Sequence, residues 1–214
     1  VHINITSIKK EIQLTSRKLE KIGYIENNPS VIEKKNDSTF HTEIELKAQI
    51  NSIHIYIGKN QHLKQLFNQD TNKDTLRIKY SESNTLLEEF IKKLEANGYP
   101  LAKVQLVDIK RKNNILIADL SIKTNSQRKI NQIVIKNNDL EKKQNYFPQN
   151  HLSQINKKFK NKILNPKTIE LLKNQFNNYS FIRQIKDPEV LFSNDSTIAY
   201  VYIEKKAANS FDGY

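Results

Sequence analysis

The repeat that decides the fold is clearest in the stretch LEANGYP, residues Leu94–Pro100. It closes a pattern in which apolar residues recur three and four positions apart, as on one face of a helix. Glycine suits the left-handed C-cap of such a helix, and the proline after it prevents the helix from restarting. The same order precedes Pro29, where Leu19–Tyr24 reads LEKIGY, and a decayed third copy reads FNNYSF at Phe176–Phe181. The sequence therefore predicts three helices that end in similar aromatic turns.

Each turn follows a predicted helix with one apolar face. The third helix opens with Asn165 and Pro166, an N-cap followed by proline at the first helical position. The apolar positions are separated by three or four residues, or by multiples of these steps. They are Ile5, Ile8, Ile12, Leu19 and Ile22 in the first copy, Leu86, Leu87, Phe90, Ile91 and Leu94 in the second, and Ile169, Leu172 and Phe176 in the third.

Two alternating runs around a polar turn follow each helix. The turns are Asn36–Ser38, Asn113–Asn114 and Asn194–Ser196, and asparagine and aspartate tolerate left-handed backbone conformations. The runs that leave them alternate between apolar and polar residues, which predicts strands with one buried face. A second marker also repeats along the chain, since Ile50–Ile55 matches Ile130–Ile135. This order favours small sheets covered by helices on one side only.

These markers predict an α+β chain of tandem small domains, each built as strand, helix, helix, strand and strand. We expect a partial domain over residues 1–48, domains over residues 49–127 and 128–206, and a short terminal segment over residues 207–214. In the second domain the first helix is weakly marked, because Asn60–Lys73 is polar with few apolar anchors. Hydrophobic residues make up 37% of the 214 positions, which suits small domains better than one large core.

Composition limits the classes of function. The formal charge of +12 favours acidic partners, which include nucleic acid, an anionic membrane surface and acidic proteins. The chain has no cysteine, and its five histidines lack the spacing of a zinc site. Its four glycines lie far apart, which excludes a glycine-rich phosphate loop. We therefore predict no catalytic, cofactor-binding or metal-binding residues and no enzyme activity in this chain. Because it contains no methionine, we also expect it to be part of a longer protein.

The order and recurrence of these segments resemble the polypeptide-transport-associated (POTRA) domain. Such domains stand in tandem before the barrel in the outer-membrane β-barrel assembly and translocation family, of which BamA and TamA are members. The matching residues are Leu19–Tyr24, the stretch LEANGYPLAKV at Leu94–Val104, the asparagine-rich hairpins and the Ile-x-Ile strands. The resemblance covers about two and a half domains, and the third copy departs from it by losing the glycine of the turn. Residues 207–214 resemble the lead-in to a barrel that is absent from this chain.

The resemblance implies a β-α-α-β-β fold with a three-stranded sheet and two helices on one face. It also implies a periplasmic receptor and scaffold without enzyme activity or cofactor, tethered to the outer membrane through the barrel. The implied partners are unfolded outer-membrane proteins or accessory assembly subunits, together with the barrel of the same parent protein. An anionic membrane surface is a further partner consistent with the charge.

Strand addition at an exposed sheet edge is the expected route to function, because such an edge offers unpaired N–H and C=O groups to an extended client. In the related fold, the strand after each aromatic turn lies at an edge. The candidate client-binding residues are Val31, Ile32, Val104, Gln105, Leu106, Val107, Val190, Leu191 and Phe192. The alternative is that these strands are paired or capped within the chain itself.

Two other functions stay open at this point. A basic α+β repeat could bind nucleic acid through aromatic residues on an open sheet face. Tyr200 and Tyr202 share such a face, but Glu43 and Asp119 occupy the corresponding face of the earlier domains, which disfavours nucleic acid. The parent protein could instead carry a hydrolase domain outside this chain.

Overall fold

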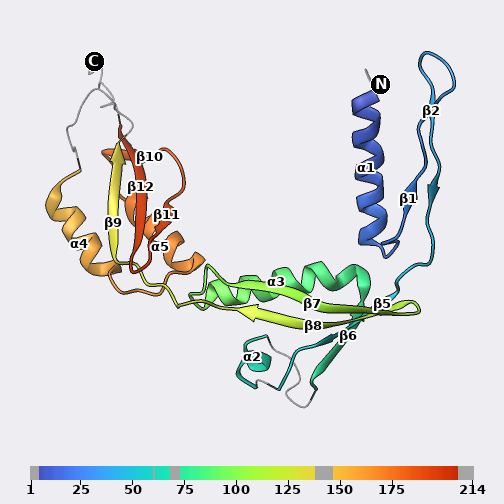
Figure 1. The fold of residues 1–214 in the computed structure, drawn as a ribbon. Coiled ribbons are helices and arrows are strands. Elements are labelled where there is room, and N and C mark those ends of the chain that lie inside the picture. Colours follow the sequence, from blue (N-terminus) through green and yellow to red (C-terminus); the bar gives the residue numbers. More distant parts are fainter. Residues whose placement is uncertain (1–4, 60, 68–72, 138–146, 207–214) are drawn as a thin grey trace. The chain divides into compact units, whose positions relative to one another are not determined.

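The computed structural model describes residues 5–59, 61–67, 73–137 and 147–206 of the chain (Figure 1). The chain divides into two compact units, residues 1–90 with 103–122 and residues 91–102 with 123–214. The terminal segment expected over residues 207–214 lies outside the described residues. The domain limits expected after residues 48 and 127 stay predictions. Among the described helices, none combines the length and the apolar character needed to cross a membrane.

The first helix of the first unit is amphipathic and is followed by a hairpin. The helix is α1 (Ile5–Lys21), and the hairpin strands are β1 (Asn28–Pro29), β2 (Glu33–Lys34), β3 (Phe40–His41) and β4 (Ile44–Glu45). On α1, Ile8, Ile12 and Leu19 are half-buried. Ile5 and Ile22, which the sequence also places on the apolar face, are exposed by 50% and 51%. The predicted helix is therefore present, but its apolar face is covered only in part.

A four-stranded sheet forms the core of the first unit. Its elements are β5 (Ser52–Tyr56), α2 (Gln61–Leu66), β6 (Thr75–Lys79), the short 3₁₀ helix η1 (Tyr80–Glu82), α3 (Ser83–Ala96), β7 (Lys103–Lys112) and β8 (Ile115–Lys123). The strand order is β6-β5-β8-β7, with β5 parallel to β8 and antiparallel to β6. Ile53, Ile55, Leu116 and Ala118 of the central strands belong to one buried cluster. Phe67 and Phe90 stack with ring centroids 3.9 Å apart and so join the α2 region to α3.

The added strand β6 is the main difference from the expected three-stranded sheet. It pairs with β5 along its whole length, from Ser52 opposite Lys79 to Tyr56 opposite Thr75. The sequence did not predict it, because Leu76 and Ile78 are its only apolar residues and two alternations are a weak strand signal. The edge of β5 is thus covered by β6, which is the outer strand of the sheet on that side.

The second unit has the expected order of elements. Besides the part of α3 after residue 90, it comprises β9 (Gln132–Asn137), α4 (Gln149–Phe159), α5 (Pro166–Asn177), β10 (Ile182–Gln184), β11 (Glu189–Phe192) and β12 (Thr197–Lys205). The central strand β12 pairs with β9 in parallel and with β10 and β11 antiparallel. The second strand of the expected pattern is therefore broken into β10 and β11. The α+β class and the β-α-α-β-β order are confirmed here (Figure 1).

Helices α4 and α5 cover the same face of the sheet of this unit. Ala199, Val201 and Ile203 of β12 belong to one buried cluster with Phe159 of α4 and Leu172 of α5. The residues between them on β12 are only half-buried and form the open face. Strict alternation along β12, visible in the sequence, is the direct cause of this one-sided core.

Helix α5 begins as its sequence predicts. The side chain of Asn165 accepts a hydrogen bond from the backbone N–H of Thr168 at 2.8 Å, and Pro166 occupies the first helical position. The bond satisfies one of the amide groups that a helix N-terminus leaves without a partner.

Candidate functional site

The two glycine turns bind residues that come shortly before the next strand along the chain, β5 or β9. Gly23 and Gly98 have φ of +107° and +88°, the left-handed backbone that the sequence predicts for them. The carbonyl of Gly23 accepts the N–H of Ile50 at 2.8 Å, and the carbonyl of Gly98 accepts the N–H of Arg128 at 2.8 Å. A Cβ atom at position 23 would lie 2.2 Å from the Ile50 carbonyl oxygen. The glycines are therefore required by close packing as well as by conformation.

A glutamine completes the same contact in both places. Gln49 donates from Nε2 to the Ile22 carbonyl at 2.8 Å, and Gln127 donates from Nε2 to the Asn97 carbonyl at 2.9 Å. We call each set of two bonds, one from a glutamine side chain and one from the next backbone N–H, a turn clasp. The match between Ile50 and Ile130 in the sequence does not reveal the clasp. Aligning Gln49 with Gln127 instead superposes the two donors and is the signal that finds the clasp.

The first predicted edge, at Val31 and Ile32, lies between strands rather than in one. Pro29 pairs with Ile44 and Glu33 pairs with His41, so residues 30–32 lie opposite residues 42–43. Three residues against two make a β-bulge. The bulge leaves Val31 85% exposed and interrupts the ladder.

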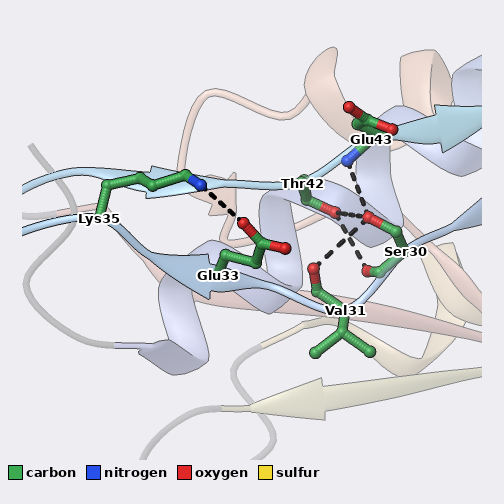
Figure 2. A network of polar contacts seen from close by, with 6 residues as sticks. All are labelled: Ser30, Val31, Glu33, Lys35, Thr42 and Glu43. Carbon is green, nitrogen blue, oxygen red and sulfur yellow. Dashed lines mark hydrogen bonds and ion pairs between the residues drawn. The ribbon is translucent and has the colours of Figure 1, made fainter.

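Side-chain hydrogen bonds bridge this bulge (Figure 2). Ser30 accepts the backbone N–H of Glu43 on its Oγ at 2.9 Å, and Thr42 donates from Oγ1 to the Ser30 carbonyl at 3.1 Å. Beyond the bulge, Lys35 and Glu33 form an ion pair at 2.8 Å on the surface. Because bulges and charged residues discourage further pairing, this hairpin is the least suitable of the predicted edges.

The second predicted edge, at Val104–Val107, lies in β7, the outer strand of the four-stranded sheet. Val104, Leu106 and Val107 are half-buried, and Gln105 is exposed. The alternation ends at Val107, and the next residue, Asp108, has a φ of +51°, which is rare for a residue other than glycine. In the described part of the chain nothing pairs with the outer side of β7. The regular free edge therefore runs only from residue 103 to residue 107.

Farther along β7, the edge is basic and held by an ion pair. Arg111 contacts Glu26, which follows the first glycine turn, at 2.5 Å. The Arg111 guanidinium lowers the pKa of the Glu26 carboxyl below its ordinary value, mainly through the hydrogen bond. Lys110 and Lys112 flank the arginine. Basic residues and the irregular Asp108 protect this half of the strand from pairing with other chains.

The third predicted edge, at Val190–Phe192, is β11. Glu189 lies opposite Tyr200, and Phe192 lies opposite Thr197 on β12. Ser193 donates its N–H to the Ser196 carbonyl at 2.9 Å. Since antiparallel bonding alternates along a strand, the backbone groups of Val190 and Phe192 point away from β12. No other described strand pairs with that outer side.

The side chains of β11 alternate between the two faces of the sheet. Val190 and Phe192 are half-buried and pack against the core beneath the helices. Leu191 is 50% exposed on the open face. The structure thus places three predicted residues on a regular edge, and their client-binding role stays a prediction.

A polar cluster lies beside β11 on the open face. Glu189 accepts a hydrogen bond from the Tyr202 hydroxyl at 2.6 Å and pairs with Lys186, whose ammonium lies 3.8 Å from the Tyr202 ring centroid. The hydrogen bonds from Lys186 and Tyr202 lower the pKa of Glu189. The bond to Glu189 raises the pKa of Tyr202. Tyr202, one of the two tyrosines that could have served nucleic acid, is therefore engaged by groups of the same chain.

No protein-family model and no curated protein matches the chain. Among solved structures, the chain is similar to POTRA domains 3–5 of BamA from Haemophilus influenzae. The TM-score is 0.54 and the identity 19%, over 92% of this chain and 80% of that one. The chain has a tandem POTRA fold. The resemblance inferred from the turn sequences is confirmed at the level of the fold.

A second similar structure holds POTRA domains 1–3 from the periplasmic domain of Omp85 from Anabaena. The TM-score is 0.45 and the identity 13%, over 71% of this chain. The chain spans 58% of the length of that structure.

Proposed function

We propose that this chain is the periplasmic portion of an outer-membrane β-barrel assembly or protein-translocation factor, tethered to the membrane by a barrel of the parent protein. Its role is that of a receptor and scaffold without enzyme activity. The observation that carries the proposal is the tandem POTRA fold, shared over 92% of the chain with the POTRA domains of BamA. The periplasmic location and the barrel tether are parts of this proposal, and both follow from the resemblance carried by the turn sequences.

The proposed activity is the capture of extended polypeptide by strand addition. An incoming strand gains main-chain hydrogen bonds at a free edge and needs little sequence specificity for them. Two edges support this activity, Val104–Val107 of β7 and Val190–Phe192 of β11, because each is regular there and has an unpaired outer side in the described part of the chain. Such capture suits unfolded barrel proteins, which consist of alternating strands.

The charge bears on the choice of partner. A net charge of +12 attracts acidic segments of clients or accessory subunits and an anionic membrane surface. It acts mainly on encounter rate and weakens with salt. We therefore assign the specific contacts with the client to the sheet edges. The positive charge serves to attract the client before these contacts form.

Titration of the isotopically labelled chain with a peptide from an unfolded barrel strand tests the proposal by NMR. We expect saturable shifts at residues 103–107 and 190–192. Val190→Pro removes an outward N–H and should suppress the shifts at β11, whereas Leu191→Ala, on the open face, should leave them intact. The proposal fails if the peptide causes no saturable shift at either edge, or if a nucleic acid causes the shift and the peptide does not.

A further inference from the structure

Arg128 belongs to the second turn clasp and also reaches the turn at the end of the edge strand β11. Its backbone N–H donates to the Gly98 carbonyl at 2.8 Å, and its own carbonyl accepts the N–H of Leu164 at 2.8 Å. Its guanidinium donates from Nη1 to the carbonyls of Ser193 and Asn194, at 3.0 and 3.2 Å. All these residues lie in the second unit. One residue therefore joins the turn after α3, the segment before α5 and the turn between β11 and β12.

The guanidinium of Arg128 also lies beside an aromatic ring of the edge strand. Its Cζ is 5.9 Å from the centroid of the Phe192 ring, within the range of a cation–π contact. Phe192 is the last residue of β11, so the arginine holds the strand where it enters the turn. Because the guanidinium is planar and carries its donors in a fixed fork, a lysine cannot make the same set of contacts.

Strand β11 depends on such an anchor because it is short and paired on one side only. It comprises Glu189–Phe192, and in the described part of the chain it pairs with β12 alone. Its turn is closed by the bond from the Ser193 N–H to the Ser196 carbonyl. Segments with few stabilising contacts open locally at a low free energy. A contact that holds the turn therefore has a large share in keeping β11 ordered.

One donor of Arg128 lacks a partner while these contacts are made. The Nε atom is buried, and among the described residues it has no hydrogen-bond acceptor. A buried N–H without an acceptor opposes the arrangement that buries it. The position of the guanidinium is thus held by its other contacts and by the fixed backbone of Arg128. Loss of the backbone bond to Gly98 should therefore favour release of the side chain from the turn.

The side chain at this position differs between the two clasps. At the first clasp, the residue after the glutamine is Ile50. Ile50 is 1% exposed and belongs to the core cluster of the first unit. Both Ile50 and Arg128 donate the backbone N–H of their clasp, so that bond does not require a charged side chain. The arginine side chain therefore serves something other than closure of the turn.

We propose that Arg128 couples closure of the second turn clasp to the order of the β11 edge. While the clasp is closed, the backbone of Arg128 is fixed and its guanidinium holds the carbonyls of Ser193 and Asn194. When the clasp opens, the guanidinium leaves these carbonyls and β11 loosens. Because coupling between two sites is reciprocal, ordering of β11 also stabilises the clasp. The inference goes beyond the proposed function and does not require a bound client.

Amide hydrogen exchange of the full chain, measured by NMR without any peptide, tests the coupling. The amide of Ser193 reports on the turn, the amide of Leu191 on β11, since by the alternation described above it points to β12, and the amide of Arg128 on the clasp. Gln127→Ala removes the clasp bond to the Asn97 carbonyl and touches no residue of β11. It should accelerate exchange at Leu191 and Ser193 by about threefold.

Arg128→Lys removes the link and keeps the positive charge and the backbone N–H. This variant alone should accelerate exchange at Leu191 and Ser193 by about threefold or more. Adding Gln127→Ala to it should cause no further acceleration at these two amides, because the route between the clasp and the strand is already broken. An arginine with a merely structural role would give additive effects instead.

Ser193→Gly tests the coupling in the reverse direction. It removes the contacts of the Ser193 Oγ with Ser196 and loosens the turn, but it keeps the backbone carbonyl that accepts from Arg128. Exchange of the Arg128 amide should become about threefold faster, as reciprocity requires. Arg183→Lys is the matched control, because it makes the same change on β10, where Arg183 pairs with Glu204 of β12. It should leave all three reporter amides unchanged.

The coupling is overturned if Gln127→Ala leaves Leu191 and Ser193 at their original rates, whether or not it accelerates the Arg128 amide. An effect of Gln127→Ala that persists in the Arg128→Lys background overturns it too, and so does an unchanged Arg128 amide in Ser193→Gly. Equal acceleration by Arg183→Lys would show a general loosening of the sheet and would also overturn it. Because no peptide is present, none of these outcomes bears on the proposed strand addition.

Discussion

Substituting Gly23 by alanine should open the first turn clasp. A residue other than glycine at φ +107° is strained by about 1–3 kcal/mol. The new Cβ would also lie 2.2 Å from the Ile50 carbonyl oxygen, a backbone atom that has to move. This movement breaks the bond between Gly23 and the Ile50 N–H, worth about 0.5–1.5 kcal/mol net. The free energy needed to open the turn should therefore fall by about 2 kcal/mol or more.

Hydrogen exchange of the Ile50 amide measures this loss directly, because that N–H is the one the clasp protects. A loss of about 2 kcal/mol corresponds to exchange about 30-fold faster. Gly58→Ala is the matched control, since Gly58 also has positive φ, at +76°, but its Cβ would have no atom within 4 Å. The reasoning is refuted if the Ile50 amide exchanges at its original rate in Gly23→Ala, or if both variants accelerate it equally.

Three further outcomes are expected. Gln127→Ala removes the bond to the Asn97 carbonyl and should cost about 0.5–1.5 kcal/mol, read as faster exchange of the Arg128 amide, with unchanged exchange counting against the clasp. Asn165→Ala removes the cap of α5 and should lower the free energy of unfolding of the second unit by about 1 kcal/mol in urea, whereas Asn165→Asp should retain most of it. The pKa of Glu189 is lowered in the folded state, so its stabilising effect is present above the ordinary value of 4.5 and is lost as the pH falls through the folded pKa. Glu189→Gln should therefore flatten the acid limb of the stability profile, and an unchanged limb would show that the cluster contributes nothing.

The features that the sequence predicted are those set by short-range rules. Gly23 and Gly98 have the left-handed backbone that helix ends require. Asn165 caps α5, and the alternation along Thr197–Lys205 produces a strand with one buried face. Each rule acts over a few residues, so each leaves a readable pattern.

The features that the sequence did not predict depend on distant residues or on single irregular positions. Strand β6 forms because β5 offers an edge to a segment with only two apolar side chains. The bulge at residues 30–32 is a register shift, and composition does not encode a shift of one residue. The positive φ of Asp108 interrupts an otherwise convincing strand in the same way.

The sequence predicted where the edges of the candidate site lie. It did not predict how regular each edge is or which side chains pack beside it. Val104–Val107 and Val190–Phe192 lie in outer strands, whereas Val31 and Ile32 lie in a bulge. An apolar groove between α5 and β11 is lined by Ile169, Val190 and Phe192, and it exists only because the helix packs beside the strand. The sequence predicted Ile169 only as part of a helix face. A groove lined by two elements cannot be predicted from the sequence pattern of either element alone.

The turn clasp also sets an order of assembly for a chain that emerges from its N-terminus. The Gly23 carbonyl can accept its hydrogen bond only after Ile50 has emerged, and the Gly98 carbonyl only after Arg128 has emerged. Each helix end is completed by the first residues of the next stretch of chain. Each turn can therefore close only after the residues that bind it have been synthesised or exported. A cut in the chain between Gly23 and Ile50, or between Gly98 and Arg128, leaves the preceding turn without this covalently linked hydrogen-bond donor.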